Sequence, residues 1–501
     1  MTSRRRSWLA LPFTALVFLI HPIVALSRPV SVFQDPGVGW HLVTGRWILE
    51  TRTLPREDVF SFTALGRPWI TYSWLFEAGG AALERVGGLP LFAAACVLVY
   101  ALIPVLVYRR CLRLGAGLFP ALFATVLAYM ILASHALARP HIFTYVFFAL
   151  TLEVLSDVQE GRAGVASLAW LPLIAVVWCN VHSGFPAGLT LVGIFAGVAA
   201  VRGVVRRDAD EGRRAGAFAL TLAAMLLATF VNPNGPWLHA EIVRHLGMAS
   251  TRYFSEFQSP DFHPSHVSIF AFELMILLVV ATVAVVGRRL AWVEVVLLVF
   301  FLHEGLESVR HMNLFAIVAA PIIAREVSRP LARWLPRLDA RSRAIVAEQA
   351  ALRAPLVYFP VLSAVFLALA LVRALPFPST LVGIQLTRGA ADFIAARQGE
   401  FRRAFNTDDL GGSLIYRFWP DLRVFVDDRI GIYGDDFIMN EYFKVLYAKP
   451  GWRDVLDRYR LTAAVVSKET VTTELLRASP GWNVAYEDDK NVIFLRGEAP
   501  P

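Results

Sequence analysis

A succession of long apolar runs constrains this chain more than any other feature of its sequence. About 20 apolar residues in a helix cross the hydrocarbon core of a bilayer, and runs near that length recur from the N-terminus to residue 375. They occupy residues 8–27, 88–108, 116–136, 141–157, 166–181, 184–203, 215–231, 267–286, 290–303, 309–324 and 355–375. With 56% hydrophobic and only 18% charged residues, much of the surface must face lipid. We therefore predict a polytopic α-helical membrane protein with about eleven transmembrane helices.

The first apolar run follows Arg4, Arg5 and Arg6, which is the layout of a signal sequence. A cleaved signal has a shorter apolar core and a small-residue cleavage site, and we recognise no such site before Ser27. We therefore expect this run to be retained as the first membrane span.

Arginines between the runs indicate how the chain is inserted, because cytoplasmic loops carry an excess of Lys and Arg. Counted from an internal N-terminus, these loops fall on one side and contain Arg109, Arg110, Arg113, Arg202, Arg206, Arg207, Arg213, Arg214, Arg288 and Arg289. The basic segment 325–353 falls there too, where an amphipathic helix can lie on the anionic inner surface. This predicts a multi-pass protein of the cell inner membrane with a cytoplasmic N-terminus. It also explains the net charge of +8 without nucleic-acid binding.

The loops on the opposite side hold clustered polar and ionisable side chains. The first outer loop spans residues 28–87, and a long outer loop spans 232–266. The polar set comprises Asp35, Trp40, His41, Arg139, His141, His182, Asn232, Asn234, Glu256, Gln258, Asp261, Glu304, Glu307, Arg310 and His311. Such groups are costly beside apolar spans and usually line a cavity. We therefore expect a functional site on the outer face.

After the transmembrane domain, residues 1–375, the composition becomes that of a soluble domain, residues 376–501. Helix-like stretches alternate with short strand-like ones, which predicts a small α/β domain. The expected helices are 388–397, 435–446, 452–459 and 470–477, and the expected strands are 422–426, 463–466, 483–486 and 491–495. An odd number of spans puts this domain on the extracytoplasmic face. Its Gly411-Gly412 pair lacks the Lys and Ser/Thr of a phosphate-binding loop.

Asp35 is the first candidate for chemistry, in the sequence Asp35-Pro-Gly-Val-Gly-Trp-His41 directly after the first span. A carboxylate held by a Pro-Gly turn beside a Trp and a His is suited to act as a general base in a partly dehydrated site. The alternative is a capping Asp on an interfacial helix that carries a Trp belt. The residues alone leave both interpretations open.

Further motifs make the pattern specific. They are Thr44-Gly-Arg-Trp-Ile48, Leu54-Pro55, Asp58, Phe60-Ser-Phe-Thr63, Trp69, Trp74-Leu75, Arg139-Pro-His141, Trp178-Cys-Asn-Val-His-Ser-Gly-Phe-Pro186, Asn232-Pro-Asn-Gly235, Glu256-Phe-Gln-Ser-Pro-Asp-Phe262, Val426-Asp-Asp-Arg429 and Tyr433. Together with the Asp35 turn, they resemble a group of bacterial multi-span proteins placed with the GT-C glycosyltransferases. The resemblance covers most of the chain.

The resemblance implies a GT-C-like bundle in which a polyprenyl-phosphate-linked sugar donor enters from the lipid. A glycan, lipid or protein acceptor would approach from outside. It also implies an acidic catalytic base in the first outer loop, and Asp35 is the matching position. The second acidic position of that turn is Gly37 here. This departure weakens the case for a two-carboxylate or metal-dependent mechanism.

The chemistry of sugar transfer suggests roles for the other outer residues. A phosphate leaving group needs permanent cations, and we expect Arg139 and Arg310 to bind it. The remaining substrate-binding candidates are His41, His141, His182, His311, Glu256 and Asp261. The histidines either donate hydrogen bonds to the phosphate or are structural. The two carboxylates either bind acceptor hydroxyls or a divalent cation, or stay solvated; no residue set has a recognised metal-ligand spacing.

The leading hypothesis is therefore a membrane glycosyltransferase that moves a sugar from a polyprenyl-phosphate carrier to an extracytoplasmic acceptor. One alternative is a transporter or flippase of a lipid-linked or anionic solute. It would need ionisable residues at mid-membrane depth, for which Glu153, Glu273 and Glu294 are candidates. Another is a non-catalytic membrane scaffold whose outer domain binds partners. Most polar residues gather at span ends on one face, which favours surface chemistry over passage.

Overall fold

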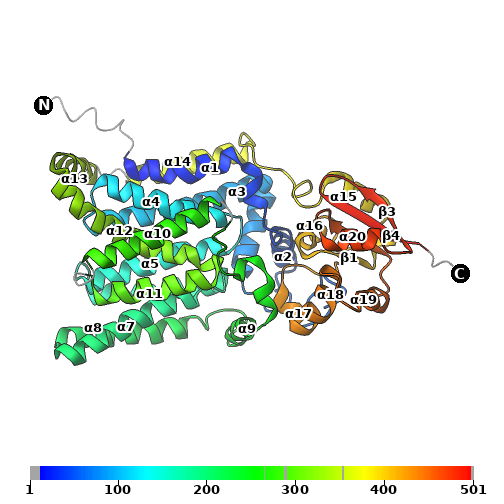
Figure 1. Ribbon diagram of the computed structural model, residues 1–501, viewed down its shortest axis with the longest axis horizontal. Helices are drawn as coiled ribbons and strands as arrows, with labels where there is room; N and C mark the ends of the chain where they lie inside the picture. Colours follow the sequence, from blue (N-terminus) through cyan, green and yellow to red (C-terminus); the bar gives the residue numbers. More distant parts are fainter. Residues whose placement is uncertain (1–11, 264–265, 287–289, 352–354, 498–501) are drawn as a thin grey trace.

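A bundle of long helices and a smaller domain with a β-sheet lie end to end in this protein (Figure 1). The coordinates are a computed structural model that describes residues 12–263, 266–286, 290–351 and 355–497. The arginines predicted to face the cytoplasm at positions 4–6, 288 and 289 lie outside the described residues.

Every apolar run of the sequence falls on a helix of the bundle. These helices are α1 (Phe13–Ser27), α3 (Trp74–Arg113), α4 (Leu118–Leu132), α5 (His141–Gln159), α6 (Trp170–Val181), α7 (Pro186–Arg206), α8 (Ala209–Ala228), α10 (Val267–Val286), α11 (Trp292–Glu307), α12 (Met312–Trp334) and α14 (Pro355–Leu371). Short 3-10 turns η3 (Ala133–His135) and η4 (Val165–Ala169) adjoin α4 and α6.

Five helices within the described residues are long and apolar enough to cross a membrane: α3, α4 with η3, α5, α7 and α10. Three more, α1, η4 with α6, and α14, are apolar but shorter. Large apolar side chains such as Leu277 and Val299 are exposed on the bundle, as lipid-facing side chains are. The predicted class, a largely helical multi-span membrane protein, is therefore confirmed.

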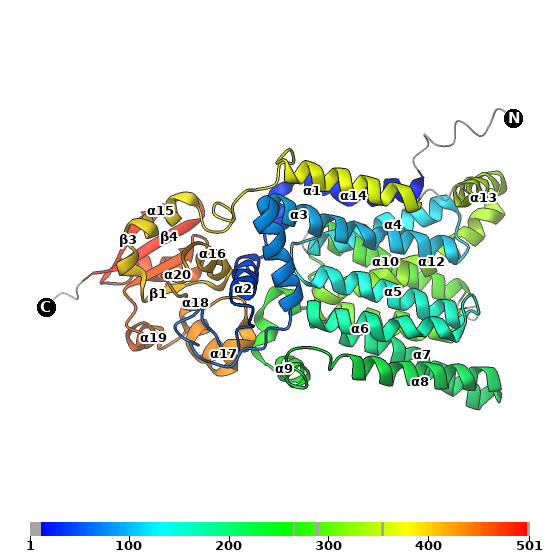
Figure 2. The ribbon, with the colours of Figure 1, turned by 180° about the vertical axis from the view of Figure 1, so that it is seen from behind.

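The two ends of the bundle differ in kind. Helix α13 (Pro336–Ala351), from the basic segment, lies at the end far from the sheet domain (Figures 1 and 2). Ser342 Oγ accepts the Leu118 N–H at 2.6 Å, and Arg343 donates to the Gly115 carbonyl at 3.2 Å, which attaches α13 to the α3–α4 turn. The loops that carry the polar motifs lie at the opposite end. They contain η2 (Pro29–Phe33), α2 (Val38–Thr51), α9 (Trp237–Leu246), η5 (Ser250–Tyr253), η6 (Ser255–Phe257) and η8 (Val309–His311).

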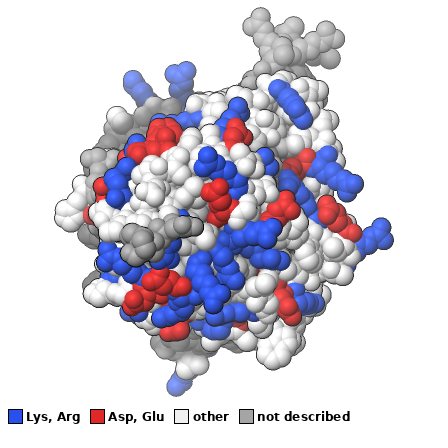
Figure 3. Space-filling model, turned by 90° about the vertical axis from the view of Figure 1, so that its right-hand side faces the viewer, with Lys and Arg blue, Asp and Glu red and all other residues white. Residues whose placement is uncertain are grey.

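The C-terminal domain is built on a four-stranded mixed sheet of order β1-β2-β4-β3. The strands are β1 (Ala404–Asn406), β2 (Ala463–Ser467), β3 (Trp482–Glu487) and β4 (Asn491–Arg496); β1 and β2 are parallel, and the other pairs are antiparallel. The helical elements are α15 (Arg388–Ala396), η9 (Gln398–Phe401), α16 (Asp408–Phe418), α17 (Ile430–Phe437), the π-turn η10 (Ile438–Tyr442), α18 (Phe443–Leu446), α19 (Trp452–Arg458) and α20 (Val471–Arg477). Basic and acidic side chains intermix on its outward face (Figure 3).

One predicted strand, 422–426, is not part of this sheet. Val424 instead forms a single parallel bridge with Ser61 of the first outer loop. The Phe62 N–H donates to the Val424 carbonyl at 3.0 Å, and the Val424 N–H donates to the Phe60 carbonyl at 3.0 Å. The apolar pattern marked a buried segment, but the prediction of a sheet strand was wrong, because the hydrogen-bonding partner is a loop more than 350 residues away.

Helix α2 is held between α3 and α16 by direct backbone contact at glycines. A Cβ on Gly39 would lie 2.0 Å from the Gly412 carbonyl oxygen, and one on Gly412 would lie 1.9 Å from the Pro36 carbonyl oxygen. On the side of α2 that faces the bundle, a Cβ on Gly45 would lie 1.9 Å from the Glu77 carbonyl oxygen. The Gly411-Gly412 pair therefore serves to dock the C-terminal domain on α2.

We expect Gly412→Ala to destabilise the protein by about 1–3 kcal/mol, because the added methyl forces α2 and α16 apart. Thermal unfolding of the purified protein in detergent measures this. Gly399→Ala, in the same domain with nothing within 4 Å of its Cβ position, is the matched control. Equal melting temperatures for the two variants would contradict the close backbone packing.

Candidate active site

Asp35 lies buried in the turn between η2 and α2. Its Oδ1 accepts the Gly37 N–H at 2.8 Å, which closes the turn in the way expected of an Asp two residues upstream. Its Oδ2 accepts a hydrogen bond from Arg139 Nη1 at 2.9 Å. Both carboxylate oxygens therefore have partners within the protein.

Arg139 connects Asp35 to the long outer loop. It lies in the turn just before α5, and its Nη1 also donates to Glu256 Oε2 at 3.0 Å. Arg310, in η8, donates to the other oxygen of Glu256 at 3.3 Å. Four span ends that are far apart in sequence thus meet through two arginines and two carboxylates.

Asp428, in the C-terminal domain, completes this group; from its sequence pattern, at the end of the expected strand 422–426, we expected either an acceptor-binding residue or part of a salt-bridged loop. Its Oδ1 accepts the indole N–H of Trp40 at 2.7 Å, and its Oδ2 lies 4.0 Å from Arg139 Nη2. We refer to Asp35, Arg139, Glu256, Arg310 and Asp428 as the outer cluster. Sequence offered one signal for Asp428: its position after an extended segment, where α/β domains often carry functional groups.

The carboxylates of the outer cluster differ in proton affinity. Burial raises the pKa of Asp35, although the charge of Arg139 opposes this. Burial and the neighbouring charge of Asp35 raise the pKa of Asp428 to about 8. Burial alone would raise the pKa of Glu256, but the charges of Arg139 and Arg310 lower it well below its usual range. Glu256 is therefore ionised at neutral pH, whereas Asp428 holds its proton more tightly than an ordinary carboxyl group.

A cavity of about 330 Å³ opens between the bundle and the C-terminal domain. Of the predicted site residues, Arg139, His141, His182, Glu256, Arg310 and His311 line it, together with Asp428. The aromatic side chains of Trp40, Trp69 and Tyr72 and the apolar ones of Ile242 and Leu314 form further parts of its wall. This combination of cations with aromatic and apolar surface suits a ligand that has a phosphate, a sugar and a hydrocarbon part.

His182 has a defined tautomer. Its Nδ1 accepts the Gly184 N–H at 3.0 Å and lies 2.8 Å from Thr144 Oγ1, which in turn accepts the indole N–H of Trp178 at 2.8 Å. Burial, with the charge of Arg310, lowers the pKa of His182 well below its ordinary value. The neutral ring therefore carries its proton on Nε2, a hydrogen-bond donor for a ligand in the cavity.

The other predicted residues are placed differently. His141 Nε2 donates to the His135 carbonyl at 2.8 Å, so that N–H is not free for a ligand. His41 does not line the cavity; its ring lies against Trp40, 3.6 Å between centroids and tilted by 32°, with Nδ1 3.0 Å from Glu77 Oε1. Asp261 is exposed and accepts the His263 N–H at 3.0 Å, apart from the outer cluster.

Comparison of folds shows what kind of molecule this arrangement belongs to. The archaeal oligosaccharyltransferase AglB from Archaeoglobus fulgidus, in complex with an inhibitory peptide and a dolichol-phosphate, superimposes with a TM-score of 0.56 at 10% identity, covering 91% of this chain and 69% of that one. The apo form of the Archaeoglobus fulgidus oligosaccharyltransferase gives 0.55 with the same identity and coverage. The chain adopts the GT-C glycosyltransferase fold. The fold that the resemblance implied is therefore confirmed.

ArnT from Cupriavidus metallidurans, bound to undecaprenyl phosphate, aligns with 98% of the present chain over 99% of its own, with a TM-score of 0.48 and 16% identity. No family model matches the sequence. No curated protein sequence matches it either.

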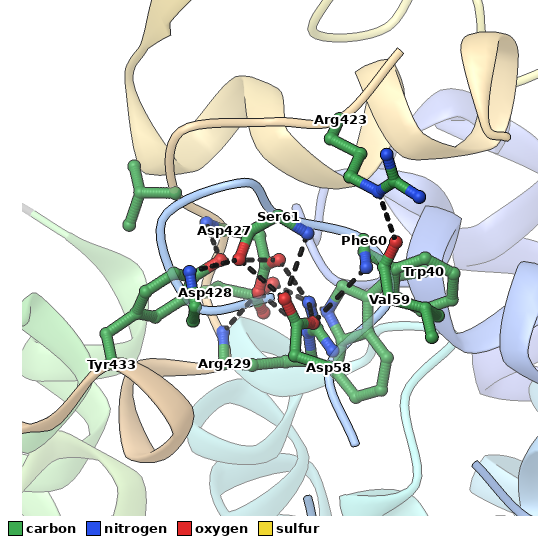
Figure 4. A network of polar contacts seen from close by, with 12 residues as sticks. Trp40, Asp58, Val59, Phe60, Ser61, Arg423, Asp427, Asp428, Arg429 and Tyr433 are labelled. Carbon is green, nitrogen blue, oxygen red and sulfur yellow. Dashed lines mark hydrogen bonds and ion pairs between the residues drawn. The ribbon is translucent and has the colours of Figure 1, made fainter. Parts of the chain in front are cut away.

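Within the GT-C fold, a buried ionic network joins the first outer loop to the C-terminal domain beside the cavity (Figure 4). Arg429 Nη2 donates to Asp58 at 2.8 Å and to Asp427 at 2.6 Å, and Tyr433 donates to Asp427 at 2.9 Å. The guanidinium also lies over the Trp69 ring, 4.5 Å from its centroid. This Arg429 network fixes the segment that carries Asp428.

Two of the three carboxylates of the outer cluster, Asp35 and Glu256, already accept hydrogen bonds from arginines. Glu256 uses one oxygen for Arg139 and the other for Arg310. Asp261, its expected partner for a divalent cation, points to solvent. In the part of the chain that the structure describes, no three His, Cys, Asp or Glu side chains are arranged to hold a metal ion.

Replacing Arg429 with Met should cost about 3–5 kcal/mol, because it leaves Asp58 and Asp427 buried without a cation. Arg423→Met is the control: Arg423 also donates to the first outer loop, to the Val59 carbonyl at 3.3 Å, but is exposed, so its loss should cost less than about 0.5 kcal/mol. Denaturant unfolding in detergent compares the two. Similar stability for both variants would contradict a structural role for the Arg429 network.

Proposed function

We propose that this protein is a membrane glycosyltransferase that moves a sugar from a polyprenyl-phosphate-linked donor to an acceptor on the outer face of the membrane. The observation that carries the proposal is the convergence of Arg139 and Arg310 on one cavity whose wall also has carboxylates and apolar surface. The shared fold with an oligosaccharyltransferase solved with a dolichol-phosphate supports the same substrate class.

The chemistry follows from the charges. Transfer breaks the bond between the sugar C1 and the carrier phosphate, and the phosphate oxygen takes the electron pair. Arg139 and Arg310 are permanent cations that stabilise this charge, and the Nε2–H of His182 adds a donor. In the outer cluster, Glu256 forms ion pairs with both arginines. The carrier phosphate therefore competes with Glu256, and a buried carboxylate accepts the proton of the acceptor hydroxyl.

The alternative of a transporter is disfavoured by the pairing of its candidate residues. Glu153 is bonded to Arg113, and Glu294 accepts two hydrogen bonds from Arg325 at 2.6 and 2.9 Å. Glu273 is exposed on α10. A path across the membrane needs such groups to line a central channel. A non-catalytic scaffold would not need the outer cluster, because the burial of its charged groups costs free energy.

Arg310→Gln should weaken binding of undecaprenyl phosphate by about 10- to 100-fold, the value of one charge-assisted hydrogen bond. The protein should fold, since Arg139 still neutralises Glu256. Binding is measured by competition with a fluorescent undecaprenyl phosphate on protein in lipid nanodiscs. Arg252→Gln, exposed in the long outer loop that also carries Glu256, is the control and should bind like the wild type. Equal affinity for both variants would remove Arg310 from the phosphate site.

We propose further that the N-terminus is cytoplasmic and the C-terminal domain extracytoplasmic. The three native cysteines are buried, so single engineered cysteines can report sidedness. In intact cells, Asp489→Cys in the C-terminal domain should react with an impermeant maleimide, whereas Arg341→Cys in α13 should react only after permeabilisation; both positions are exposed. Labelling in the reverse order would contradict the orientation.

A further inference from the structure

The turn that carries Asp35 has Gly37 where a second acid would stand, yet a second carboxylate occupies the space beside it. The Cβ position of Gly37 lies 2.6 Å from Asp428 Oδ2 and 2.9 Å from Asp35 Oδ1. The two carboxyl groups therefore face each other across the bare Cα of Gly37. Any side chain at position 37 would expel Asp428 from this place.

Only one of these two carboxyls reaches the cavity. The side chain of Asp35 is 3% exposed, with its oxygens bonded to the Gly37 N–H and to Arg139. The side chain of Asp428 is 15% exposed and lines the cavity. Its Oδ1 is held by Trp40, and its Oδ2 lies 4.0 Å from Arg139, beyond hydrogen-bonding distance. A ligand in the cavity meets Asp428 and is separated from Asp35.

The charges around the pair favour retention of one proton. The outer cluster has three carboxylates and two arginines, and the Arg429 network has two carboxylates and one arginine. The titratable and charged groups whose charge acts on the pair are Arg139, Glu256, Arg310, Asp427 and Tyr72. Two carboxyls that share a poorly hydrated site do not both ionise readily. The high pKa of Asp428 agrees with this count.

We infer that Asp428 is the catalytic residue that takes the proton of the acceptor hydroxyl, and that Asp35 is a positioning residue that sets its proton affinity. This rests on the proposed function. The acceptor oxygen attacks the sugar C1, its proton passes to the Asp428 carboxylate, and the C1–O bond to phosphate breaks with its electron pair on the leaving oxygen. The C-terminal domain thus supplies the base. Asp35, the position in the first outer loop that matches the expected catalytic acid, acts only through Asp428.

The two aspartates should respond differently to amide substitution. Asp428→Asn keeps the Trp40 hydrogen bond and should lower release of undecaprenyl phosphate from undecaprenyl-phosphate-linked monosaccharides by about 100-fold or more. Affinity for undecaprenyl phosphate should change less than twofold. Asp35→Asn removes a negative neighbour, so the pKa of Asp428 falls and the rise of activity with pH moves to lower pH. Asp421→Asn, exposed in the same domain, should match the wild type.

The measurements use the full chain in lipid nanodiscs, with a panel of undecaprenyl-phosphate-linked monosaccharides and cell-envelope extract as acceptor. An infrared titration of protonated carboxyl groups accompanies them. Its expected result is a band that titrates near pH 8, disappears in Asp428→Asn and shifts to lower pH in Asp35→Asn. Gly37→Ala, which displaces Asp428, should lose transfer and keep undecaprenyl phosphate binding.

The outcomes separate the two proposals. Full transfer by Asp428→Asn, or loss of transfer in Asp35→Asn with no shifted pH profile, would overturn the assignment of the base while leaving the glycosyltransferase intact. A wild-type protein that neither binds undecaprenyl phosphate nor releases it would overturn the proposed function. Even then, absence of the carboxyl band that depends on Asp428 would refute the shared proton independently of activity.

Discussion

The buried guanidinium of Arg429, bonded to Asp58 on one side and to Asp427 on the other, is the contact on which the arrangement of this protein depends. Asp58 belongs to the loop that leaves the first bundle helices, and Asp427 belongs to the C-terminal domain. Three charges buried together are stable only when each has its partner, because an unpaired one costs several kcal/mol. The pairing therefore specifies a single way for the two parts to meet.

The docking of the C-terminal domain on the first outer loop determines the electrostatics of the cavity. Asp428 follows directly after Asp427, so the backbone that is fixed by the Arg429 network also delivers Asp428 to Asp35 and Trp40. The glycine contacts of α2 with α16 set the distance, since any added Cβ would collide with a carbonyl oxygen. The C-terminal domain is thus part of the cavity wall, and its docking and the charge state of the cluster are coupled.

Sequence predicted those features that depend on local chemistry. Apolar length is a property of each segment, so every predicted run is a helix, and the strands at β2, β3 and β4 were correctly located. The three-residue strand β1 is too short to give a pattern. Residues 422–426 were misread because extended backbone has the same periodicity whether its partner is a strand or a loop. Glu256 and Asp261 lie in one loop, yet only Glu256, in the 3-10 turn η6, is directed to the arginines.

The partnership of Asp35 with Asp428 lay beyond sequence reasoning for a physical reason. Gly37 read as a missing acid, because the carboxyl that fills its place lies nearly 400 residues further along the chain and arrives only through tertiary packing. A glycine beside a carboxylate can have two meanings. Either a functional side chain has been lost at that position, or the position leaves space for a side chain from a distant part of the sequence. Here the space is filled by a carboxyl oxygen 2.6 Å from the Cβ position, so the second meaning holds. A buried acid pair assembled from two domains exists only in the docked state, so its raised proton affinity depends on docking.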